Sequence, residues 1–215
     1  MTTPYPELLQ RWAATVAALV PGAAPVDPEP YARNLLGRWA EPHRAYHTPA
    51  HLAAVLGHLD TLADHPADLH LVRLAAWFHD AVYHPERDTN EDRSARLAER
   101  ALPELGIGEK ETAEVARLVR LTVTHDPEPD DTNGEALCDA DLAVLAASPE
   151  DYAAYAAAVR TEYGFVPDPD FRTGRAAVLT QLLALPRLFR TPYGARHWED
   201  AARHNLSTEL ALLSP

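Results

Sequence analysis

Apolar residues recur at helical spacing along nearly the whole chain, and this repeat constrains the fold more than any other feature. Prolines and glycines divide the repeat into segments, and no segment shows the alternation of apolar and polar residues that is typical of a strand. The pattern therefore predicts an all-α bundle. We expect its helices near residues 7–20, 28–39, 49–62, 67–80, 91–102, 115–122, 139–147, 171–185 and 198–212, with another starting at residue 149. We expect loops at residues 84–89 and 126–134, and Asn90 as a helix cap.

The length of 215 residues suits one domain with a full hydrophobic core. No apolar run approaches the roughly 20 residues needed to span a bilayer, and the N-terminal residues lack the pattern of a secretory signal. Cys138 is the only cysteine, which excludes an internal disulfide. We therefore expect a cytoplasmic protein, for which association with copies of itself stays open.

A net charge of −13 argues against general binding to nucleic acids or to anionic membranes, which requires a basic surface. A small phosphorylated substrate would need a local device to overcome this field. A divalent metal and a few arginines would supply one. The charge by itself is also explained as a means of keeping the protein soluble.

Histidines and aspartates gather in three short segments. His47 and His51 flank the start of a predicted helix, because Pro49 between them favours the first helical position. His79 and Asp80 close an apolar helix, and Asp141 interrupts an apolar stretch. Burying a carboxylate beside an imidazole is costly unless a metal or hydrogen bonds compensate. Imidazole and carboxylate together suit Mn, Fe, Zn, Co or Ni.

The order of His51, His79-Asp80 and Asp141 resembles the H…HD…D signature of the HD superfamily. Val55 and residues 140–142 match further positions of that signature, and residues 46–51 resemble a segment of class I cyclic-nucleotide phosphodiesterases. More closely, the chain is similar to a bacterial group of HD phosphohydrolases over roughly residues 38–210. That resemblance is carried by residues 44–47, 78–83, 89–95, 139–142 and 159–163.

The resemblance implies one HD-type helical domain over residues 1–215, with helices in residues 1–40 packed on its core. It implies a divalent metal held by His51, His79, Asp80 and Asp141. Water activated by that metal would attack the phosphorus of an ester or anhydride, which we expect in a nucleotide. His47 would be the general acid. We expect one tight site for Mn, Fe, Co, Ni, Mg or Zn, with any second ion held weakly through Asp80 and water.

Other residues have a functional and a structural interpretation. Glu91 is our candidate for orienting water, or else an acidic residue of a first helical turn. His125 is a candidate for contacting substrate, or else a surface histidine. Arg44 and Arg160 could hold phosphate oxygens, although Arg160 could equally pair with Glu162 or another acid. Asp139 would orient a ligand histidine or cap a helix.

Two other functions stay open. One is a di-iron oxygenase of the HD type, which needs a fuller histidine set than this chain supplies. The other is a non-catalytic HD module that binds a nucleotide as a sensor. The complete set of expected ligands favours the phosphohydrolase.

Overall fold

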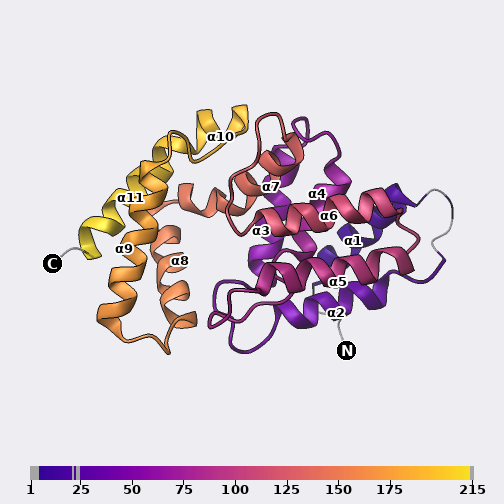
Figure 1. The fold of residues 1–215 in the computed structure, drawn as a ribbon, viewed down its shortest axis with the longest axis horizontal. Coiled ribbons are helices and arrows are strands. Elements are labelled where there is room, and N and C mark those ends of the chain that lie inside the picture. Colours follow the sequence, from indigo (N-terminus) through magenta and orange to yellow (C-terminus); the bar gives the residue numbers. More distant parts are fainter. Residues whose placement is uncertain (1–4, 21, 23–24, 214–215) are drawn as a thin grey trace.

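A computed structural model describes residues 5–20, 22 and 25–213, and it confirms the predicted all-α architecture. No strand occurs among these residues (Figure 1). The helices are α1 (Pro6–Leu19), α2 (Glu29–Trp39), α3 (Pro49–Thr61), α4 (Leu69–Phe78), α5 (Asn90–Glu104), α6 (Glu109–Leu121), α7 (Thr132–Leu142), the 3₁₀ helix η1 (Ala143–Ala146), α8 (Pro149–Glu162), α9 (Asp168–Ala184), α10 (Pro192–His197) and α11 (Glu199–Leu213).

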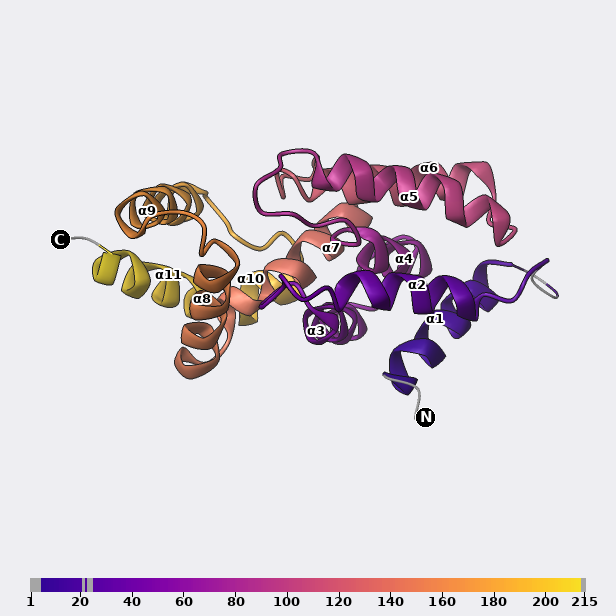
Figure 2. The same cartoon turned by 90° about the horizontal axis from the view of Figure 1, so that it is seen from below.

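Helix α4 lies at the centre of the larger part of the molecule, with α5 and α6 on one side and α1, α2 and α3 on the other (Figure 2). All of its residues from Leu74 to Phe78 are fully buried, which explains why this segment is apolar on every face. Trp12 of α1 and Trp39 of α2 are also fully buried in this core. The N-terminal helices are therefore part of the same hydrophobic core as the central helix.

A second, smaller hydrophobic cluster lies under the C-terminal helices α8, α9 and α11 and the 3₁₀ helix η1. Leu145, Leu179, Phe189 and Leu206 form its centre. Trp198 is partly buried against both clusters and joins them. In Figure 1 these helices form the left part of the molecule, beyond the end of α7.

Three expected boundaries were wrong. The helix expected near residues 115–122 is α6, which already begins at Glu109. The loop predicted for residues 126–134 ends early, because α7 already begins at Thr132, where the Asp131 carboxylate accepts a hydrogen bond from the Gly134 amide. The single helix predicted for residues 139–147 is the end of α7 followed by η1.

Asn90 also differs from the expectation. It lies inside α5, after the capping position at Thr89. Its side-chain oxygen instead accepts a hydrogen bond from the His84 amide, and its side-chain nitrogen donates to the carbonyls of His84 and Arg87. The short helix α10 was not predicted. Among the described residues, no helix combines the length and the apolar character that crossing a bilayer requires.

Candidate metal centre

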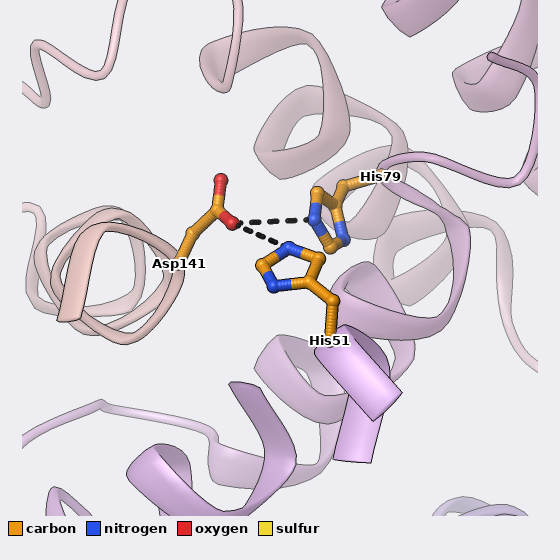
Figure 3. A group of neighbouring side chains, drawn as sticks. All are labelled: His51, His79 and Asp141. Atoms are coloured by element: carbon orange, nitrogen blue, oxygen red, sulfur yellow. Dashed lines mark ion pairs between the residues drawn. The ribbon is translucent and has the colours of Figure 1, made fainter. Parts of the chain in front are cut away.

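Three helices bring the predicted ligands together. His51 lies in the first turn of α3, which Pro49 begins, and His79 directly follows the last residue of α4. Asp141 lies in the last turn of α7. Figure 3 shows the two imidazoles from one side and the carboxylate from the other, pointing toward a common point.

The distances fit a metal site. His51 Nε2 lies 3.0 Å from Asp141 Oδ1, and His79 Nε2 lies 3.5 Å from the same oxygen. One ligand atom from each of the three residues lies within 4.8 Å of the other two. Asp80 borders this group, with its Oδ2 at 3.2 Å from His79 Nε2. His51, His79 and Asp141 therefore could hold a metal ion, with Asp80 beside them.

The environment of the two imidazoles fits a bound cation. The Nε2 atoms of His51 and His79 are both buried and make no hydrogen bond. His79 Nδ1 donates to the Ala76 carbonyl at 2.8 Å, so the neutral ring carries its lone pair on Nε2. That lone pair faces carboxylate oxygens, and a cation between them, either a second proton on the ring or a metal ion, removes the repulsion. A carbonyl that fixes the tautomer in this way is typical of histidines that bind metals.

The charges of the site lead to the same conclusion. Burial lowers the pKa of His79, but the carboxylates of Asp80 and Asp141 outweigh burial and raise it well above its usual value. Burial raises the pKa of Asp80 and of Asp141. The nearby histidines, His79 foremost, outweigh the effect of burial and hold the pKa of both carboxyls well below its usual range. The geometry concentrates negative charge at one buried point, and this charge favours a bound cation.

His125 belongs to the site although it lies in the loop after α6. Its Nε2 is 2.8 Å from Asp141 Oδ2, the oxygen that does not face His51. His125 has a φ of 51°, a left-handed conformation that is uncommon outside glycine. The loop thus holds this imidazole against the carboxylate, where it orients Asp141.

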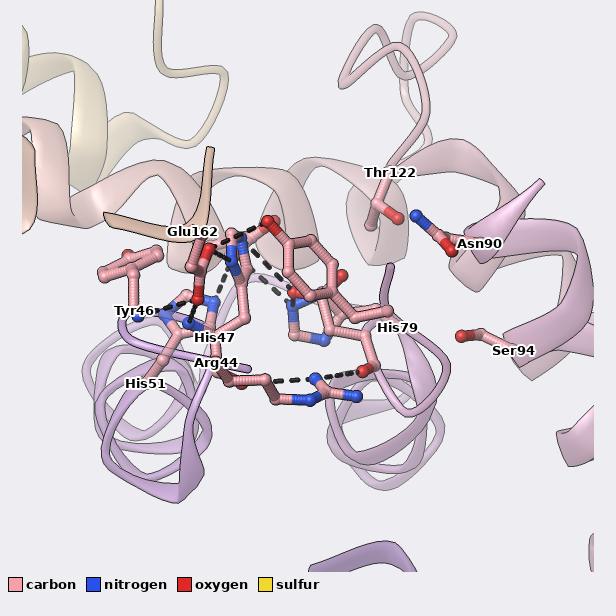
Figure 4. Close-up of polar contacts among 12 residues, drawn as sticks. Arg44, Tyr46, His47, His51, His79, Asn90, Ser94, Thr122 and Glu162 are labelled. Carbon is pink, nitrogen blue, oxygen red and sulfur yellow. Dashed lines mark hydrogen bonds and ion pairs between the residues drawn. The ribbon is translucent and has the colours of Figure 1, made fainter. Parts of the chain in front are cut away.

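His47 is held by a residue that we did not predict as functional, Glu162 of α8. The Glu162 carboxylate is fully buried and lies 2.7 Å from His47 Nδ1 (Figure 4). It also accepts hydrogen bonds from the backbone amides of Ala45, Tyr46 and His47 and from the Tyr83 hydroxyl. An ionised carboxylate can only accept, so Nδ1 donates. His47 Nε2 then lies on the side of the metal centre, 3.9 Å from Asp80 Oδ2.

This contact shifts the pKa of both partners. Burial lowers the pKa of His47, but the charges of Asp80 and Glu162 outweigh burial and raise it. Burial raises the pKa of Glu162, while its hydrogen bonds with His47 and the backbone lower it to about 2. Residues 159–163 are one of the segments that carry the resemblance drawn from the sequence, and that was the one signal that could have identified Glu162.

Arg44 and Arg160 are not placed to hold a phosphate. The Arg44 side chain is fully buried, and its guanidinium donates to the carbonyls of His47, Asp80 and Ala81. Arg44 therefore fixes the two ligand segments to each other. Arg160 donates to the carbonyls of residues 163 and 166, and it lies 3.4 Å from Asp168 rather than pairing with Glu162.

Glu91 and Asp139 make no hydrogen bond or ion pair with the candidate metal ligands among the described residues. Glu91 lies in the first turn of α5, and among the described residues no hydrogen bond or ion pair connects it to the centre. The Asp139 carboxylate is fully buried and accepts hydrogen bonds from the Arg190 and Thr191 amides and from the Thr191 hydroxyl. Asp139 thus holds the segment that begins α10, and it orients no ligand histidine.

Comparison of the chain with protein-family models, with curated proteins and with solved structures found no match.

Proposed function

We propose that the protein is a metal-dependent phosphohydrolase acting on a small phosphorylated substrate. The observation that carries this proposal is that the buried Nε2 atoms of His51 and His79 make no hydrogen bond and both face Asp141 Oδ1. The resemblance of the same residues to the HD superfamily supports it. So does His47, whose proton-carrying ring lies beside the centre.

A divalent metal in this centre supplies Lewis acidity, which lowers the pKa of water and draws negative charge from a phosphate. His51, His79 and Asp141 would hold it, with Asp80 as a further ligand. Manganese, iron, cobalt, nickel, zinc or magnesium would suit these donors to different degrees.

The chain's own residues then handle the protons. In hydrolysis, a water oxygen bonds to phosphorus and the bond between phosphorus and the leaving oxygen breaks. His47 Nε2 gives its proton to that leaving oxygen, and the attacking water releases one proton that restores the imidazolium. Glu162 keeps the ring oriented throughout, because its carboxylate stays hydrogen-bonded to Nδ1, and it stabilises the positive charge of the ring whenever the ring is protonated.

The test is a screen of phosphomonoesters, phosphodiesters and anhydrides with each metal in turn, on the wild type and on Asp141→Asn. We expect turnover that requires metal and that falls by at least about 10³-fold in the variant. Oxygen uptake by the iron-loaded protein without any phosphate release would instead favour an oxygenase. Tight nucleotide binding with no turnover under any metal would favour a sensor.

A further inference from the structure

A cavity of about 460 Å³ adjoins the metal centre between α3, α7, η1 and α8. His51 and Asp141 are part of its wall, so a group bound in the cavity lies beside the proposed reaction centre. Its volume falls in the range of roughly 300–1,000 Å³ that is usual for small-molecule sites. Most residues that line the cavity are not among the site residues that the resemblance implies.

The wall of the cavity is mostly apolar and carries no positive charge. Nine alanines line it, together with the rings of Tyr46, Tyr155 and Trp198. No lysine or arginine is among the described lining residues, and its two acidic members are Asp141 and Asp151. A second phosphate or any other anion bound here would face carboxylates without a compensating cation. The wall therefore disfavours an anionic group.

His58 is a polar residue of this wall, and the proposed metal set does not include it. It lies on α3, two turns beyond His51, and its ring packs edge-on against Trp198 with the ring centroids 5.4 Å apart. Neither ring nitrogen of His58 makes a hydrogen bond with any described residue. Burial lowers the pKa of His58, so the ring is neutral near pH 7 and offers one donor and one acceptor. A bound group with matching polar atoms would satisfy both.

We propose that this cavity binds the organic part of the substrate, an uncharged planar heterocycle such as that of a nucleoside, and that His58 forms hydrogen bonds with it. Aromatic rings and alanine methyl groups favour a flat, weakly polar ligand. The inference rests on the proposed function and narrows its substrates to monophosphates. Their single phosphoryl group reaches the metal centre, whereas a di- or triphosphate brings extra charge to an acidic wall.

The first test compares two neighbouring alanines of α3. Both are exposed to solvent, but Ala54 lines the cavity and Ala53 lies outside its wall, so Ala54→Leu and Ala53→Leu add the same side chain in two places. We compare kcat/KM for the four common ribonucleoside monophosphates with kcat/KM for methyl phosphate. The kcat/KM for a nucleoside monophosphate divided by that for methyl phosphate should fall about tenfold in Ala54→Leu. The same quotient should stay within about twofold of wild type in Ala53→Leu. The corresponding triphosphates should be poorer substrates of the wild type.

The second test needs no turnover. Isothermal titration calorimetry measures binding of the four unphosphorylated nucleosides to the full chain and to His58→Phe, which keeps a ring but removes both polar atoms. Binding of at least one nucleoside should weaken in the variant by about two- to tenfold for each hydrogen bond that is lost. Circular dichroism verifies that each variant is folded.

The two tests separate this inference from the proposed function. If methyl phosphate is hydrolysed but no nucleoside binds, or if the substrate ratio is the same in all proteins, the inference is overturned and the phosphohydrolase stands. If nucleosides bind through His58 but no phosphate is released with any metal, the binding site stands and the proposed function fails.

Discussion

At the scale of single residues, the structure separates two histidines that look alike in the sequence. His51 turns its unpaired Nε2 toward Asp141, whereas His47 donates through Nδ1 to Glu162 and stands beside the ligands. We propose that one ring binds a cation and that the other carries a proton. The two residues should therefore fail in different ways when replaced.

We expect His51→Ala to lose metal and His47→Ala to keep it while losing rate. The loss for His47→Ala should be about 10²–10⁴-fold if this residue is the general acid. It should be smaller for an aryl phosphate with a nitrophenolate leaving group, which departs without a proton. Elemental analysis and kinetics on both substrate types make the measurement, with exposed His197→Ala as the control. Loss of metal from His47→Ala would make His47 a ligand and contradict our assignment.

Glu162 positions His47 and should reveal this in the pH profile. The carboxylate helps to raise the pKa of His47, and a general acid works only while it is protonated. In Glu162→Gln the pKa of His47 should fall, so the decline of kcat on the alkaline side should begin at a lower pH than in wild type. A purely structural role for Glu162 would lower stability, measured by thermal unfolding, but would leave the position of that decline unchanged.

At the scale of elements, helix α10 depends on a contact with α7. Asp139 of α7 holds the amides of Arg190 and Thr191, and the Thr191 hydroxyl in turn accepts from the Gly194 amide. The approach is so close that a Cβ at Gly194 would lie 2.6 Å from Asp139 Oδ2 and 2.8 Å from the Cβ of Phe189. Glycine is required at this position because of crowding rather than backbone conformation.

Two glycine-to-alanine substitutions should therefore act in opposite directions. Gly194→Ala should lower the free energy of unfolding by about 1–3 kcal/mol, as overpacking does. Gly174 lies in the interior of α9 with nothing within 4 Å of an added Cβ. Gly174→Ala should raise the free energy by roughly 0.5–1 kcal/mol, because alanine loses less backbone entropy in a helix. Urea unfolding measures both, and equal effects would contradict the crowding.

At the scale of the whole molecule, the candidate ligands connect three helices, and the loop before α3 is held by Glu162 of α8. A metal at the centre would bind the native arrangement and not the separated segments of the unfolded chain. Metal binding and global stability should consequently be linked.

Adding Mn, Co or Ni to chelator-treated protein should raise its melting temperature. At a free metal concentration of 100 times Kd, the gain should be about 2.7 kcal/mol. Asp141→Asn should abolish the gain, whereas Asp130→Asn, which removes an exposed carboxylate, should preserve it. A similar gain in all three proteins would indicate nonspecific binding to acidic residues and count against the centre.

The sequence by itself determined the helical architecture and most of the residues of the candidate metal centre. Helices follow from neighbours three and four residues apart, so Leu52, Val55 and Leu59 reveal α3 without any knowledge of its partners. Paired ligands such as His79 and Asp80 are also adjacent in the chain, and their segments stand out because polar groups interrupt apolar stretches.

Only the tertiary structure decided which partner each polar group has. Glu162 reaches His47 across 115 positions of the chain, and nothing local to either residue indicates that contact. Arg44 looked available for phosphate until packing placed backbone carbonyls around its guanidinium. Nothing local to His58 indicates a role, and it lines a cavity only because three other elements enclose the space beside it. Hydrogen bonds and burial depend on groups that folding brings together from distant segments, and local periodicity carries no information about those groups.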